Sequence, residues 1–405
     1  MTPTSLILPP IDLPLDSILP DEPLLLMGAG PVPVSQKVAM ANSVVINHLG
    51  DTMNKVIERV RVMSQYVFQT RSKHIIGVAG PGSAAMEMAI TNLVWPGRKV
   101  LSINNGFFSS RLAEMAERVG ATVVQYTPTE GQGAEADKVE ALLKDGDFDV
   151  VTLVQGETSC TVWNDQLAQI TQTAHKLGVL SIVDAVCTLS TMPLQMDDWK
   201  VDVVITGGQK GLASIPGVSL IAFSEHVWPV IMERTAPMPH WCLDVRLASQ
   251  FWEEKGYHYT APVSGILALH EALRQVCLET LEKRFDRHLV CSSALQMAIE
   301  AMGLKLFIEP KSRLNSVVGI EVPKGIDSKQ VLTTMSNLYK VEISGSFGLP
   351  IIRIGQMGEQ SRAHNIYRTL HALGMSMKSS GYSVDLPAGM AELERILDTK
   401  EDLTA

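Results

Sequence analysis

Residues 180–211, LSIVDAVCTLSTMPLQMDDWKVDVVITGGQKG, contain two short apolar runs that decide the fold. The runs Leu180–Val183 and Val201–Thr206 are mainly apolar, as expected of strands that helices cover on both faces. The first run ends in Asp184, and the second leads through two glycines to Lys210. Ligands of parallel sheets bind beyond the carboxyl ends of the strands, so a site is expected at these two residues.

Strand and helix patterns alternate on the N-terminal side of these runs. Short apolar runs predict strands, and apolar residues spaced three and four apart predict the helices between them. The predicted strands are His74–Val78, Lys99–Ile103, Thr122–Tyr126 and Val150–Val154, and the predicted helices are Met53–Gln69, Ala84–Leu93, Ser109–Val119, Lys138–Leu143 and Asp165–Leu177. Repeated strand–helix–strand units need crossover connections, which predicts a mainly parallel sheet.

The last third of the chain has a different pattern. A long helical stretch over 264–302 is followed by predicted strands at Ser316–Val322 and Val341–Ser344 and predicted helices at Ser328–Leu338 and Gln360–Leu373. We therefore expect an α/β protein with a large, mainly parallel domain over 24–280 and a smaller α+β C-terminal domain over 281–405. Residues 1–23 are rich in Leu, Ile and Pro, which predicts an extended arm that lies on its own body or on a partner subunit.

Composition narrows the class of protein. The 405 residues include 34 Lys+Arg and 43 Asp+Glu, a formal charge of −9, which argues against nucleic acid or an anionic membrane as the main partner. No apolar run approaches the roughly 18 residues of a membrane span. The five cysteines form no C-x-x-C pair, so neither a disulfide framework nor a structural zinc site is indicated. We expect a cytoplasmic protein with reduced thiols and no metal.

Two loops after predicted strands have features of a binding site. Gly80-Pro81-Gly82-Ser83-Ala84 opens a helix, where small residues let an anion approach free backbone N–H groups; a plain turn explains the same residues. Phe107 and Phe108 follow a second strand. They either pack in the core or stack on a planar ligand.

Asp184 and Lys210 complete the set. A carboxylate that ends a buried strand caps a helix, binds a metal or holds a protonated nitrogen, and metal is the weakest of these because no His/Glu cluster accompanies it. Lys210 is either a surface charge or a buried amine, whose pKa would be lowered and which would be nucleophilic. Pyridoxal 5′-phosphate (PLP) needs all four parts: a phosphate clamp, a ring partner, an acid for its nitrogen and a Lys for its aldehyde.

Eight motifs carry a resemblance to a known family. They are residues 25–31 (LLMGAGP), 80–87 (GPGSAAME), 105–108 (NGFF), 156–159 (GETS), 183–186 (VDAV), 207–210 (GGQK), 257–262 (YHYTAP) and 353–358 (RIGQMG). In this order they resemble fold-type-I PLP enzymes of aminotransferase class V, nearest to the alanine–glyoxylate or serine–pyruvate group. The resemblance implies ping-pong transfer of an amino group from a small donor, such as alanine or serine, to glyoxylate or pyruvate.

The resemblance also implies roles for single residues. Lys210 matches the Lys that bonds to the cofactor and transfers protons, Asp184 the partner of the ring nitrogen, and Arg353 the group that binds the substrate carboxylate. Other cofactor positions are Gly82, Ser83, Ala84, Phe108, Ser159, Val186 and Gln209, and Gly28 and Ser159 are expected near the substrate. Tyr257 and Thr260 match residues that reach the phosphate from a neighbouring subunit, which implies a homodimer with shared sites.

Three alternatives remain. The first is another class V PLP enzyme: a pyridoxamine–pyruvate or ureidoglycine–glyoxylate aminotransferase, or a desulfurase or lyase that uses Cys160. Ser264 stands where ureide-specific relatives often carry Asn, which argues against ureidoglycine. The second is a dehydrogenase that reads Gly28-Ala29-Gly30 as a nucleotide loop, although the third Gly of that fingerprint is missing. The third is a non-catalytic protein that keeps the fold.

Overall fold

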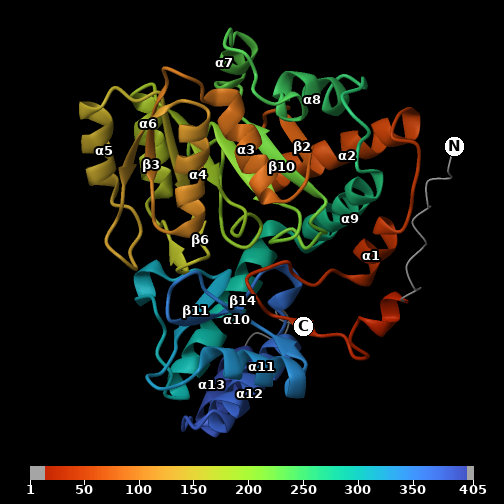
Figure 1. Cartoon of the computed structure of the whole chain (residues 1–405). Coiled ribbons are helices and arrows are strands. Elements are labelled where there is room, and N and C mark those ends of the chain that lie inside the picture. The colour runs from red at the N-terminus through yellow and green to blue at the C-terminus, as the bar shows by residue number, and fades with distance from the viewer. Residues whose placement is uncertain (1–13, 399–405) are drawn as a thin grey trace, which may run out of the picture.

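A seven-stranded sheet forms the centre of the larger part of the molecule in this computed structural model, which describes residues 14–398 (Figure 1). Its strand order is β2-β10-β9-β8-β5-β3-β4. The strands are β2 (Ile75–Ala79), β3 (Lys99–Ile103), β4 (Thr122–Tyr126), β5 (Val150–Val154), β8 (Leu180–Asp184), β9 (Val203–Gly207) and β10 (Val218–Phe223). β10 is antiparallel to β2 and β9, whereas the other neighbours pair in parallel, so the mainly parallel sheet is confirmed.

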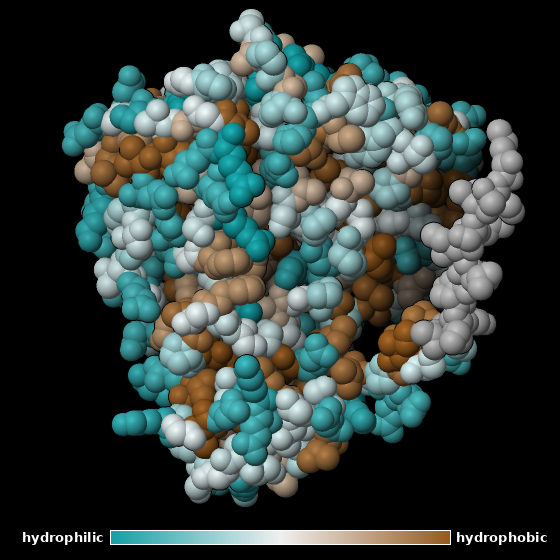
Figure 2. Space-filling view, viewed as in Figure 1, coloured by the Kyte–Doolittle hydropathy of each residue, from teal (hydrophilic) through white to brown (hydrophobic). Residues whose placement is uncertain are grey.

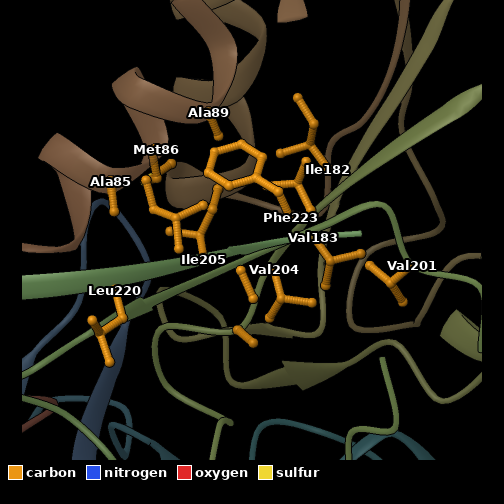
Figure 3. Close-up of a cluster of buried hydrophobic side chains, with 14 of the residues drawn as sticks. Ala85, Met86, Ala89, Ile182, Val183, Val201, Val204, Ile205, Leu220 and Phe223 are labelled. Atoms are coloured by element: carbon orange, nitrogen blue, oxygen red, sulfur yellow. The ribbon is translucent and has the colours of Figure 1, made fainter. Parts of the chain in front are cut away.

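Helices cover the sheet, and their apolar faces bury its residues. They are α2 (Asp51–Phe68), α3 (Gly82–Leu93), α4 (Phe107–Arg118), α5 (Ala136–Asp145), α6 (Leu167–Lys176), α7 (Trp228–Met232), α8 (Val245–Trp252) and α9 (Val263–Glu279), and α1 (Gln36–Asn42) packs on α9. In Figure 3, Ala85, Met86 and Ala89 of α3 lie over Ile205 of β9 and Phe223 of β10. All five side chains are at most 2% exposed, so α3 packs tightly against β9, which leads to Lys210, and against β10.

A second hydrophobic cluster belongs to the C-terminal part. Its helices are α10 (Leu281–Ala301), α11 (Ser328–Tyr339), α12 (Ala363–Ser379) and α13 (Leu386–Leu397), and its sheet is β11 (Val317–Glu321), β14 (Ile351–Gly355) and β13 (Ser344–Gly345). β1 (Leu25–Leu26) pairs with β12 (Val341–Glu342), and Met27 packs in the same cluster. Backbone pairing thus joins residues 25–27, which follow the boundary expected at residue 24, to the C-terminal part.

Two other expectations differ from the structure. The helical stretch over 264–302 is two helices, α9 and α10, because Thr280 between them has a φ of 69° and interrupts the helical backbone. The strand expected at Val341–Ser344 is two short strands, β12 and β13, which pair with different partners. β10 and α13 were not predicted at all, although β10 is fully buried and α13 packs on α10.

The N-terminal segment lies along the outside of the molecule. Of the expected arm at 1–23, residues 1–13 fall outside the described part of the chain. In residues 14–23, Leu15, Ile18 and Leu19 expose 68%, 70% and 56% of their surface. In Figure 2 hydrophobic surface appears where this segment lies, beside the grey atoms. Among residues 14–398, no helix combines the length and the apolar character that a bilayer crossing requires.

Candidate active site

Lys210 lies just beyond the carboxyl end of β9, where the chain turns through residues 208–211. The side chain is partly buried, and its amine donates a hydrogen bond to the carbonyl oxygen of Ala29. Burial lowers the pKa of Lys210, which favours the neutral, nucleophilic form of the amine. Gly30 has a φ of +98°, and a Cβ there would overlap the Lys210 side chain, so both the turn and the close approach require glycine.

A cavity of about 220 Å³ brings together side chains from both parts of the molecule. Lys210, Phe108 and Arg353 line it, together with Gly28 and Phe347. The Phe108 ring meets Phe347 edge to face at 5.9 Å between centroids. Three residues that are far apart in sequence, and that the motifs single out, thus face one space.

Arg353 is held rigidly in β14 and is only 5% exposed. Its Nε donates to the carbonyl oxygen of Gly345 at 2.8 Å, and its Nη1 donates to that of Thr158 at 2.7 Å. Within residues 14–398, Nη2 donates to no protein acceptor. The two backbone carbonyls orient the guanidinium, and its Nη2 group is still able to donate. Such a group is suited to binding a carboxylate in the cavity.

Asp184 ends β8 and is 6% exposed. Its Oδ1 accepts a hydrogen bond from the backbone N–H of Val186 at 2.8 Å. Burial raises the pKa of Asp184 to about 7, and nearby Glu157 raises it further, whereas the Val186 N–H and the Lys210 amine act against the rise. Across the described residues it has no Lys, Arg or His within ion-pair distance. The carboxylate therefore favours a cationic partner that the protein itself does not supply.

The start of α3 provides donors for an anion beside Asp184. Pro81 precedes the helix, and the N–H groups of Gly82 and Ser83 meet no acceptor among residues 14–398. A Cβ at Gly82 would come within 2.8 Å of the Val186 side chain, so this turn packs closely against a residue two positions after Asp184. The Oε1 atom of Gln209 is buried without a hydrogen-bond partner. An anion would be bound by the two N–H groups, because an amide oxygen such as Gln209 Oε1 can only accept.

Glu157 was missed as a functional residue, although the motif at 156–159 contains it. It is fully buried and accepts hydrogen bonds from the backbone N–H groups of Phe108, Ser109 and Ser159 and from both serine hydroxyls. The carboxylate thereby caps α4 at the turn that carries Phe108. In the sequence, the one indication of this role is that a carboxylate lies beside Ser159. The N–H groups of Phe108 and Ser109, which it binds, lie 49 and 48 positions away along the chain.

Other predicted residues lie around the cavity without lining it. The Ser159 hydroxyl donates to Glu157 Oε1 at 2.6 Å and accepts from the Phe107 N–H at 3.0 Å. Ser83 Oγ accepts from Arg111 at 3.4 Å, and Ala84 is half-buried. Tyr257 and Thr260 are exposed and lie outside the cavity of their own chain.

Comparisons with known proteins place the chain in a family. Residues 35–358 match the family model described as aminotransferase class V. The chain is 32% identical to an alanine–glyoxylate aminotransferase from Drosophila melanogaster, over 93% of this chain and 98% of that protein. It is 29% identical to an L-aspartate–glyoxylate aminotransferase from Paracoccus denitrificans, over 91% and 94%. The solved structure of a ureidoglycine–glyoxylate aminotransferase from Bacillus subtilis superposes with a TM-score of 0.91 at 29% identity, covering 94% of this chain and 99% of that one.

Proposed function

The chain belongs to the class-V aminotransferases, and on this basis we propose that it moves an amino group from a small neutral amino acid to glyoxylate, with PLP as its cofactor. One observation carries the proposal: Lys210, Arg353 and Phe108 face a single small cavity. The family and the fold imply this cofactor, because class-V aminotransferases are PLP enzymes.

The residues fit the cofactor. A phosphate would accept from the free N–H groups of Gly82 and Ser83, with Gln209 beside them. A protonated ring nitrogen would supply the cation that Asp184 lacks, and would lower the pKa that burial now raises. We assign covalent attachment to Lys210 and one ring face to Phe108.

The chain's own groups then have defined tasks. When bound, the cofactor supplies an aldehyde that takes up the amino group and a ring that withdraws electrons from the substrate Cα. The Lys210 amine removes the proton from that Cα and later returns a proton, because burial keeps its pKa low. Arg353 orients the donor by its α-carboxylate, and Asp184 holds the proton on the ring nitrogen. Donor and acceptor use the cavity in turn, which gives ping-pong kinetics.

The cavity favours a donor with an uncharged side chain. Among its lining residues only Lys210 and Arg353 are cationic, and we assign these to the cofactor and to the α-carboxylate of the donor. The remaining charged residue of the lining, Glu342, is acidic. A second carboxylate, as in aspartate, would therefore find no cation here. The three relatives named above differ in donor but share glyoxylate in their names, which supports glyoxylate as acceptor.

A desulfurase is less well supported. Its chemistry needs a reactive thiolate, but burial raises the pKa of Cys160 to about 12. The Sγ of Cys160 also lies 3.4 Å from the carbonyl oxygen of Asn105, in a hydrogen bond. The dehydrogenase reading also fails, because β1, which precedes Gly28, pairs with β12 and not with the main sheet.

We propose a homodimer in which Tyr257 and Thr260 reach the phosphate of the partner's site. Both are exposed, and neither lines the cavity of its own chain. The exposed leucines at 15 and 19 would give the N-terminal arm a surface to cover on the partner.

A half-reaction screen tests the function. Protein loaded with PLP is mixed with alanine, serine, aspartate, cysteine or pyridoxamine, and the absorbance of the bound cofactor is followed; glyoxylate, pyruvate or 2-oxoglutarate is then added. We expect alanine or serine to convert the cofactor, and glyoxylate to regenerate it fastest. Conversion by aspartate alone, or sulfide release from cysteine, would contradict the proposal. The Arg353→Lys variant tests whether Arg353 binds the α-carboxylate, because lysine keeps the charge but cannot form two parallel hydrogen bonds.

A further inference from the structure

A second group of functional side chains lies at the edge of the main sheet opposite Lys210. His175 is in the last turn of α6, Asp202 directly precedes β9, and His226 follows β10. Because β10 is antiparallel to β9, its end lies beside the start of β9. All three residues line a surface hollow of about 920 Å³ that contains no residue of the active site.

The geometry of these side chains suits a metal ion. One ligand atom from each lies within 4.8 Å of the other two. Nδ1 of His226 is 2.9 Å from Oδ1 of Asp202, and the ring centroids of His175 and His226 are 4.8 Å apart. Ligand atoms bound about 2.0–2.2 Å from a zinc ion lie roughly 3–3.5 Å from one another. The His226 side chain is 52% exposed and so has room to rotate. A small rotation brings the three ligand atoms to the distances that zinc coordination requires.

Two groups of this set lack a partner that a cation would supply. Asp202 is 1% exposed, and its carboxylate accepts from the N–H and Oγ of Ser181, from Ser224 Oγ and from His226 Nδ1, but no Lys or Arg of residues 14–398 is within ion-pair distance. Nδ1 of His175 is buried and has no hydrogen-bond partner. The hydrogen bonds to Asp202 bring no permanent positive charge to this buried carboxylate, and none of them reaches Nδ1 of His175.

The charge of the hollow favours a cation as well. Its lining includes the acidic residues Asp197, Asp198, Asp202 and Glu225 against the basic residues Arg71 and Lys200. Two imidazoles and one carboxylate select a transition metal such as Zn²⁺ over Mg²⁺ or Ca²⁺, which prefer oxygen ligands throughout.

We propose that His175, Asp202 and His226 bind one divalent transition-metal ion of the zinc class, with water at the remaining coordination position. The ion would tie the end of α6 to the starts of β9 and of the segment after β10, and so stabilise the sheet edge far from the catalytic residues.

The test uses the full-length, PLP-loaded protein in a Cys242→Ser background, which removes an exposed thiol as a competing ligand. After treatment with a chelator, Zn²⁺ is titrated calorimetrically and Co²⁺ spectroscopically. We expect one equivalent per chain, a Co²⁺ spectrum of tetrahedral nitrogen and oxygen ligation, and a melting temperature that rises with Zn²⁺. His175→Asn and His226→Asn should each weaken Zn²⁺ binding at least tenfold and abolish the rise.

His364→Asn is the matched control, since His364 is an exposed histidine on α12 in the other part of the molecule. It should bind Zn²⁺ as the background protein does. All variants should keep the metal-free melting temperature and the aminotransferase half-reaction, because the site lies outside the catalytic cavity. Unchanged Zn²⁺ affinity in the His175→Asn/His226→Asn double variant, or an equal loss in His364→Asn, would overturn the proposal.

Discussion

Glu157→Gln tests whether one buried carboxylate fixes the start of α4. Each carboxylate oxygen accepts from a backbone N–H that cannot turn away: Oε1 from Ser159 at 3.1 Å and Oε2 from Ser109 at 2.8 Å. The serine hydroxyls can rotate to accept from a glutamine NH₂ group, but the N–H groups cannot. Whichever oxygen is replaced, one buried backbone donor therefore loses its acceptor.

The expected cost follows from these bonds. An unsatisfied buried N–H costs about 1–3 kcal/mol, and a hydrogen bond to a charged acceptor contributes roughly 1 kcal/mol more than one to a neutral acceptor. Removing a buried charge offsets part of this cost. We expect the free energy of unfolding of the cofactor-free protein to fall by about 2–4 kcal/mol. PLP affinity should fall as well, because the same turn positions Phe108.

Urea unfolding followed by circular dichroism measures the stability, and equilibrium titration measures PLP binding. Glu114→Gln is the matched control, because Glu114 lies on the same helix but is exposed and forms a surface ion pair with Arg118. Its effect should stay below about 1 kcal/mol. If Glu157→Gln unfolds like the control and binds PLP as tightly as the wild type, the carboxylate does not hold this turn, and the argument fails.

Four further outcomes are expected. Lys210→Ala should lose turnover and the absorbance of covalently bound cofactor; retention of both would refute its role. Because burial raises the pKa of Asp184 from 3.8 to about 7, the folded cofactor-free chain binds this proton more tightly than the unfolded chain, so the free energy of unfolding should decrease from about pH 4 to 7 and then level off. Asp184→Asn should flatten this part of the pH profile, and an unchanged profile would assign the decrease to other groups. Arg353→Lys should raise the KM of the donor roughly 10–100-fold with a smaller change in kcat, because lysine keeps the charge but loses the fork. Mixed dimers of Lys210→Ala chains with Tyr257→Phe/Thr260→Ala chains should regain activity that neither variant has alone, since only shared sites create one intact site per mixed dimer.

The parts of the fold that sequence could predict are those that local pattern determines. Strands buried on both faces are mostly apolar, which is why β3 and β5 begin and end at the predicted residues. β4 also has the predicted bounds, although it is a more exposed strand at the edge of the sheet. The break at Thr280 was missed because apolar residues keep their helical spacing on both sides of it. Only its backbone conformation, with a φ of 69°, separates α9 from α10.

The same distinction applies to function. Lys210 and Asp184 could be predicted because each follows a recognisable strand, so one local signal marks each of them. Glu157 contacts donors at 108 and 109, and the proposed metal site joins His175, Asp202 and His226 from the ends of three separate elements. No spacing in the sequence encodes such a set, because what brings it together is the strand order β8-β9-β10 and the reversed direction of β10. Since β10 was not predicted, a site that depends on where β10 ends could not be predicted either, and only the folded sheet makes it testable.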